Sequence, residues 1–143
     1  MKNLIVTSID LGVPEEWSNA LPTNIQKIDK GIGSFLTIDT ALVSLWVYLC
    51  DWSFTINGSE ILSSDVQDEE VFEKILTPLS EEYLASIKIS GENSIVLSFS
   101  QGYELSIFAN FEEYDGEDDL LIAFFKKGEP LAYSPERGWY RGN

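Results

Sequence analysis

Carboxylates are the only side chains that this sequence holds in the numbers that acid–base or metal chemistry would require. It contains 24 Asp and Glu residues, one cysteine and no histidine. This excludes Ser–His and Cys–His catalysis and histidine-based metal sites. Paired carboxylates of the glycosidase kind are compatible with the composition, but among so many acids a close pair arises by chance. Asp39 and Asp51, at the ends of predicted strands beside aromatic residues, are the best catalytic candidates. We expect structural roles for both and predict no catalytic residue.

The densest acidic run, at residues 112–119, offers oxygen ligands of the kind that Ca²⁺ and Mg²⁺ prefer. It lacks the ligand spacing of an EF-hand loop. We therefore expect a solvated hairpin loop, with partner contact as the second interpretation, and predict neither a metal site nor a cofactor. The segment Gly31-Ile32-Gly33 lacks the third glycine and the βαβ context of a dinucleotide-binding fingerprint.

The distribution of charge is more informative than any motif. The formal net charge is −15, and eight acids but no base lie between Lys30 and Lys74, and again between Lys88 and Lys126. Ordinary surfaces intersperse both signs, so a field of one sign favours a positively charged protein partner. Nucleic acids and anionic membranes are disfavoured as partners because both require a basic surface.

The predicted partner-binding residues fall into two groups. The first lies in and before a predicted helix and the second in the acidic loop: Asp65, Asp68, Glu69, Glu70 and Glu73, and Glu112, Glu113, Asp115, Glu117, Asp118 and Asp119. The helix group has a second, local explanation, because negative side chains near a helix N-terminus are favoured by the helix dipole.

The elements that must position these acids follow from hydrophobic periodicity. We expect a helix over residues 68–77, capped by Ser64 or Asp65 and ended by Pro78. Asn57-Gly58 is a strong hairpin signal. Strands are expected over residues 4–11, 32–39, 42–49, 52–56, 84–89, 95–100, 103–107, 120–125 and 130–133, a short helix is expected to open at residue 14, and residues 24–33 are expected to be a loop. The apolar strands 42–49 and 120–125 are expected to be buried on both faces.

These elements predict an α+β fold in one domain, residues 1–143. It would be a mostly antiparallel sheet with a C-terminal meander and one main helix, near residues 67–77, packed on it. The longest apolar run, residues 41–50, is too short to span a bilayer. The N-terminus turns polar too early for a signal peptide, so we expect a cytoplasmic protein.

Two further features have simple structural interpretations. Cys50, within the longest apolar run, is expected to be a small buried hydrophobe. The last ten residues hold both arginines of the chain together with Trp139 and Tyr140, residue types that are enriched at binding hot spots. We expect instead that Trp139 packs on the sheet edge and that the arginines pair with the acidic body.

The C-terminal half resembles a known type of protein. Residues 84–89 and 95–107 have a β-meander pattern in which Phe99-Ser100-Gln101-Gly102 forms a turn, and an acidic loop and an apolar strand follow. This pattern, over about residues 80–135, is similar to small acidic bacterial immunity proteins, the antidotes encoded beside polymorphic and contact-dependent growth inhibition toxins. It also fits other bacterial α+β domains. The resemblance implies a toxin as partner and carries over no catalytic or contact residue.

Charge and resemblance together predict a non-enzymatic immunity protein that neutralises a basic, nuclease-type toxin. One alternative is a carboxylate-based hydrolase or small-ligand domain, which requires a deep pocket with facing carboxylates. Another is a DNA-mimic regulator, which requires carboxylates spaced like duplex phosphates. The identity of the toxin and the oligomeric state are not predicted.

Overall fold

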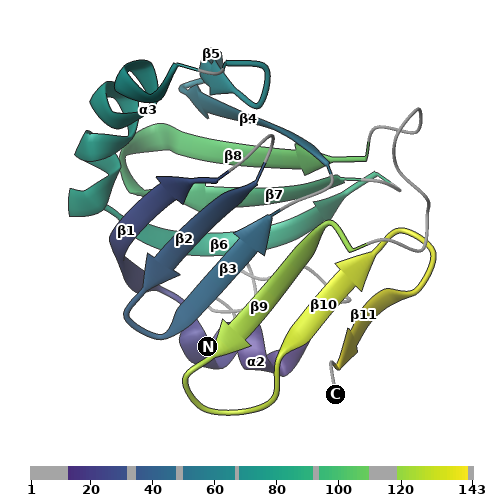
Figure 1. Cartoon of the computed structure of the whole chain (residues 1–143). Coiled ribbons are helices and arrows are strands. Elements are labelled where there is room, and N and C mark those ends of the chain that lie inside the picture. The colour runs from purple at the N-terminus through teal and green to yellow at the C-terminus, as the bar shows by residue number, and fades with distance from the viewer. Residues whose placement is uncertain are drawn as a thin grey trace.

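The computed structural model of the chain describes residues 13–31, 35–47, 50–66, 68–91, 94–109 and 119–141. These residues form one 11-stranded sheet in the order β11-β10-β9-β3-β2-β1-β6-β7-β8-β4-β5 (Figure 1), and all pairs are antiparallel. The strands are β1 (Thr23–Lys30), β2 (Leu36–Thr40), β3 (Val43–Val47), β4 (Asp51–Ile56), β5 (Ser59–Ser63), β6 (Tyr83–Ser90), β7 (Ser94–Phe99), β8 (Tyr103–Phe108), β9 (Leu121–Phe125), β10 (Leu131–Ser134) and β11 (Gly138–Arg141).

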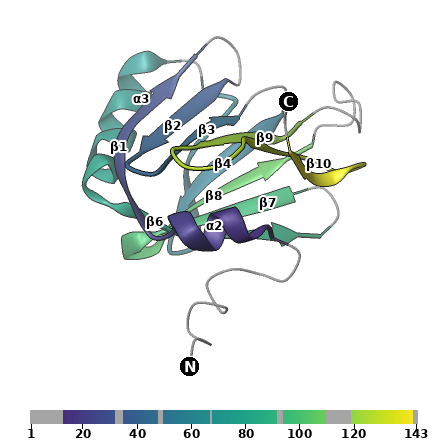
Figure 2. The same ribbon diagram turned by 90° about the horizontal axis from the view of Figure 1, so that it is seen from below.

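The sheet folds over on itself at β1. This strand pairs with β2 along most of its length but with β6 only through Thr23 and Asn24. Strands β6, β7 and β8 consequently cross behind β1, β2 and β3, and helix α2 (Glu15–Ala20) lies below them (Figures 1 and 2). The core between these two layers is made of fully buried apolar side chains such as Leu45, Trp52 and Leu97.

The main helix closes one end of this folded sheet. Helix α3 (Glu69–Leu76) continues as the 3₁₀ helix η1 (Thr77–Glu81). The helix packs mainly against β1 and β5, and Phe72 meets the ring of Trp52 edge-on at a centroid distance of 5.6 Å. A mostly antiparallel sheet with one main helix is thus confirmed, and the helix packs on this sheet mainly through β1 and β5.

The cap of α3 is Asp68, not Ser64 or Asp65. The Asp68 carboxylate accepts a hydrogen bond of 2.9 Å from the backbone N–H of Glu70. Ser64 is buried and used elsewhere, because its hydroxyl accepts from the Trp52 N–H at 3.1 Å and donates to Asp51 at 3.2 Å. Pro78 ends the α-helix close to the predicted place, and its ring is tolerated in the first turn of η1.

Local turn chemistry is confirmed at the β4–β5 hairpin. Asn57 and Gly58 have positive φ angles of 50° and 89°, as a two-residue hairpin turn requires. The Asn57 N–H donates to the carbonyl of Gly102 at 3.0 Å, so this hairpin is tied to the predicted turn between β7 and β8. The short helix after Pro14 is also present as α2, whereas the strand predicted at residues 4–11 lies outside the described residues.

The predicted loop at residues 24–33 is wrong, because most of it forms β1. A register shift between Ile25 and Lys27 interrupts the alternation of apolar and polar residues in this strand. Ile25 and Ile28 both reach the core side despite their odd spacing, which is why the period of two was hidden in the sequence.

Two strands that were predicted to be buried on both faces are buried on one only. In β3, Val43, Leu45 and Val47 are buried, but Trp46 between them is 42% exposed. In β9, Phe124 is 37% exposed. β6, β7 and β8 form the predicted meander, but β9 leaves it and pairs with β3 instead.

Candidate partner-binding surfaces

The acids of the helix region form an exposed surface. Asp65, Asp68, Glu69, Glu70 and Glu73 are all exposed, and we call this set the acidic helix surface. Among the described residues, ion pairs join Lys27 to Asp29 at 3.2 Å, and Arg141 to Glu16 at 2.8 Å and Glu129 at 3.7 Å. None involves the acidic helix surface, so its negative charge is not neutralised by pairing within the described part of the chain.

The acidic loop is described only at its end. Glu112, Glu113, Asp115, Glu117 and Asp118 lie outside the described residues. Asp119 accepts a hydrogen bond from the Tyr140 hydroxyl. Burial, and then this hydrogen bond and the charge of Asp119, raise the pKa of Tyr140. The strands next to Asp119, β9 and β10, lie away from α3 in both views (Figures 1 and 2), so the structure does not join Asp119 to the acidic helix surface.

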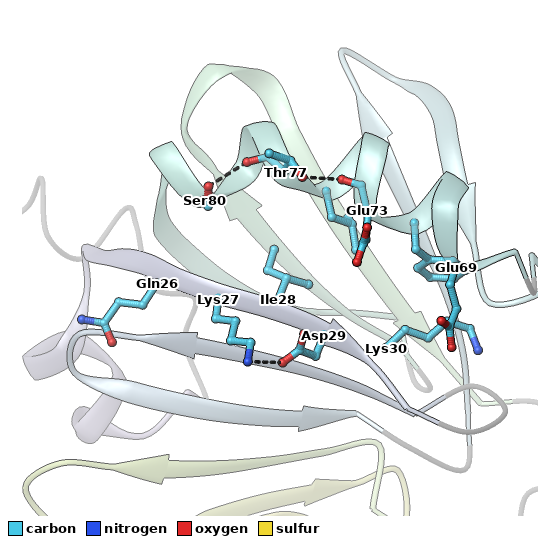
Figure 3. A pocket seen from close by; sticks show the side chains of 11 residues that line it. Gln26, Lys27, Ile28, Asp29, Lys30, Glu69, Glu73, Thr77 and Ser80 are labelled. Carbon is cyan, nitrogen blue, oxygen red and sulfur yellow. Dashed lines mark hydrogen bonds and ion pairs between the residues drawn. The ribbon is translucent and has the colours of Figure 1, made fainter.

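A hollow of about 420 Å³ lies between β1 and α3 (Figure 3). Ile28 points toward the helix, and Glu69 and Glu73 line the helix side. The Thr77 and Ser80 hydroxyls donate to backbone carbonyls at 2.5 and 2.7 Å. Glu69 and Glu73 are exposed to solvent, so they lack the enclosed surroundings that catalytic carboxylate pairs use.

Asp39 and Asp51 lie in different parts of the sheet. Asp39, on β2, lies opposite Lys27 of β1 and Ser44 of β3. Asp51 begins β4 and lies opposite Phe108 of β8. The Asp51 carboxylate accepts from the buried Ser64 hydroxyl, which is a structural role. Among the described residues, no group of three or more His, Cys, Asp or Glu side chains is arranged to hold a metal ion.

Cys50 is a buried thiol, as predicted. It is 4% exposed, and its Sγ donates to the carbonyl of Leu120 at 3.6 Å. Burial, and to a smaller extent the charge of Asp51, raise the pKa of Cys50 to about 12. The thiol is therefore protonated at neutral pH, a form that is a poor nucleophile.

The C-terminal tail is built into the fold as β11. Trp139 packs on Tyr133 and Trp17, with ring centroids 5.1 and 5.7 Å apart. Arg141 pairs with Glu16 of α2, which confirms the predicted pairing for this arginine. Arg137 instead lies over the ring of Tyr140 at 5.1 Å.

An exposed apolar surface is the feature that sequence reasoning missed. Trp46 and Phe124 project from the outer face of β3 and β9, and their ring centroids are 5.0 Å apart. The only sequence signal is Ser44, a polar residue two positions before Trp46 in an otherwise apolar run. In a strand these two residues share a face, so Ser44 indicates that this face is not part of the core.

Comparison with known proteins adds no identification. No protein-family model, no curated protein and no solved structure matches the chain. Among the described residues, no helix is both long and apolar enough to cross a membrane.

Proposed function

We propose that this chain is a non-enzymatic, cytoplasmic immunity protein that binds and neutralises a basic, nuclease-type bacterial toxin. The observation that carries the proposal is the acidic helix surface, whose five exposed carboxylates lie within residues 65–73 and have no ion pair among the described residues. A net charge of −15 makes the long-range field negative as well.

The physical mechanism has a fast electrostatic step. A nuclease carries a basic cleft because it binds phosphate, and opposite charge steers two proteins together at up to about 10⁸–10⁹ M⁻¹s⁻¹ at low salt. The carboxylates then occupy positions that phosphates would take in the cleft. Exposed charges of this kind lose most of their long-range effect when the Debye length shortens to about 8 Å at physiological salt.

The two alternatives have less support. A carboxylate-based hydrolase requires facing, enclosed carboxylates, and the hollow beside α3 presents exposed ones. A DNA mimic requires acids spaced along an extended surface, whereas the described acids of the helix region occupy a single short segment.

The test is a titration against the product of the neighbouring toxin-like gene, purified as a catalytically inactive variant. The triple variant Glu69→Gln/Glu70→Gln/Glu73→Gln is expected to slow association at low salt by about tenfold. A matched control, Glu15→Gln/Glu104→Gln/Glu136→Gln, removes the same formal charge from other exposed positions and is expected to have a much smaller effect. Absence of binding by the unsubstituted chain contradicts the proposed function.

A further inference from the structure

The outer face of one half of the sheet carries a continuous row of side chains across six strands. Its register runs from Asp29 to Thr37, Trp46, Ile122, Ala132 and Tyr140, on β1, β2, β3, β9, β10 and β11. A second row, Lys27, Asp39, Ser44 and Phe124, lies beside it. We call the accessible apolar part of these rows, Trp46, Ile122, Phe124 and Tyr140, the aromatic face; Ala132 in the first row is buried.

The aromatic face has a well-defined centre. Trp46 contacts Phe124 on one side and Phe35 on the other, with centroid distances of 5.0 and 6.0 Å, both edge-on. Trp46 and Phe124 remain 42% and 37% exposed. Two large aromatic side chains held together and left open to water mark an interaction site more often than isolated exposed residues do.

The other half of the same sheet has a more polar outer face. The outer face of β4, β5, β7 and β8 carries mainly short polar residues and glutamates, and its exposed aromatic residue Phe108 lies opposite Asp51 and Ser94. Two of its paired rows contain Ser63, Ser53, Ser106 and Val96, and Glu60, Thr55, Glu104 and Ser98. A mainly polar surface is what a solvent-facing sheet normally presents, and the aromatic pair Trp46 and Phe124 on β3 and β9 departs from it.

The aromatic face lies beside charged residues, and one of its rings already binds a cation. Asp39 lies in its second row, between Lys27 and Ser44, and Asp119 accepts a hydrogen bond from the Tyr140 hydroxyl. The guanidinium of Arg137 already stacks on the Tyr140 ring, which is favourable because the face of an aromatic ring attracts cations. A centre of aromatic residues with a polar rim is the usual anatomy of a protein interface, and the net charge of −15 favours a basic partner on it.

We propose that the aromatic face is the anchor of the interface with the basic toxin, and that it receives arginine and apolar side chains of that partner. This inference rests on the proposed function. The acidic helix surface then governs the rate of association, and the aromatic face governs the rate of dissociation, because anchoring contacts act mainly on dissociation. The strand β1, against which α3 packs, is three strands from β9, about 14 Å at the usual strand spacing, so the two surfaces lie on neighbouring parts of the sheet.

The experiment measures association and dissociation rates with the purified, catalytically inactive product of the neighbouring toxin-like gene. Trp46→Thr and Phe124→Thr keep a strand-forming residue while removing the ring. Each is expected to raise the dissociation rate by about 30-fold, the effect of a hot spot, and to change the association rate by less than about threefold. Phe108→Thr is the matched control, because Phe108 is 39% exposed on the outer face of β8.

A second pair of variants covers the case in which losing Trp46 unfolds the chain. Ser44→Arg places a cation beside Phe124 and leaves every aromatic side chain in place, and it is expected to weaken binding by at least about tenfold. Ser106→Arg makes the same change of charge on the outer face of β8 and is expected to weaken binding by less than about threefold.

The outcomes are distinguishable. If the unsubstituted chain does not bind the toxin, the proposed function is contradicted and this interface with it. If it binds and both Trp46→Thr and Ser44→Arg bind within about twofold of it, the function stands and the aromatic face is excluded as the anchor. If Phe108→Thr weakens binding as much as Trp46→Thr, the assigned face is wrong.

Discussion

Replacing Thr40 with valine removes one hydroxyl from a buried hydrogen-bond chain that holds the turn between β2 and β3. The Thr23 hydroxyl donates to Thr40 Oγ1 at 3.1 Å, and the Thr40 hydroxyl donates to the Val43 carbonyl at 2.7 Å. Thr40 Oγ1 also accepts from the Val43 N–H at 3.1 Å. These three hydrogen bonds fix the start of β3, the strand that carries Trp46.

The magnitude follows from the bonds that valine cannot make. Thr40→Val keeps the side-chain volume but leaves the Val43 N–H without this acceptor, at a residue that is 2% exposed. A buried donor that is left without an acceptor lowers the free energy of unfolding by about 1–3 kcal/mol, and each lost hydrogen bond lowers it by about 1 kcal/mol. We expect a loss of about 3 kcal/mol in the free energy of unfolding. Thr40→Ser keeps the hydroxyl, loses one methyl group and is expected to cost about 1 kcal/mol.

Urea unfolding, followed by tryptophan fluorescence, measures the free energy of unfolding of both variants. An unchanged slope of this free energy against urea concentration shows that the unfolded states are comparable. Thr23→Val in the Thr40→Val background is expected to cost less than it does alone, because the Thr23 hydroxyl has already lost its acceptor. This account of the turn would be refuted if Thr40→Val were as stable as Thr40→Ser. It would also be refuted if the stability losses of Thr23→Val and Thr40→Val simply added in the double variant.

Two other residues give sharp expectations. Because the pKa of Cys50 is raised from 9.0 to about 12 in the folded chain, the unfolded chain loses the thiol proton first as the pH rises. Folding stability is therefore expected to fall from about pH 9 upward, and to fall less steeply in Cys50→Ala when unfolding is measured at alkaline pH. Under native conditions at neutral pH, a thiol reagent is expected to label Cys50 far more slowly than in denaturant; equal rates would contradict its burial. Asp68→Ala is expected to lower stability by about 1 kcal/mol through loss of the helix cap. Asp68→Asn retains the cap and is expected to cost much less in thermal unfolding, and equal costs for the two variants would show that charge rather than capping matters there.

Local signals predicted those parts of the fold that a few neighbouring residues determine. Asn57-Gly58 specified its own turn geometry, and the spacing of Phe72 and Leu76 specified α3. The strand β1 was missed because a register shift after Ile25 broke its alternation. The pairing of β9 with β3, which brings Leu45 opposite Ala123, was beyond prediction because no local signal reports which distant strand lies alongside.

The candidate surfaces divide in the same way. Exposure of the helix acids follows from the amphipathic pattern around Phe72, so their exposure was predictable from the sequence. The aromatic face was missed because a run such as residues 42–49 does not show which side of a strand is covered. The outer face of β3 is exposed because no other element of the described structure covers Trp46, and this follows only from the arrangement of the whole sheet.

The most direct measurement is the association rate of this chain with the inactive product of the neighbouring toxin-like gene, followed by stopped flow as the salt concentration is raised from about 10 mM to about 150 mM. The account predicts tight binding, an association rate that falls by at least about tenfold over this range, and a weaker salt dependence in Glu69→Gln/Glu70→Gln/Glu73→Gln. No binding, or an association rate that does not change with salt, would contradict the claim that an acidic surface directs this protein to a basic partner.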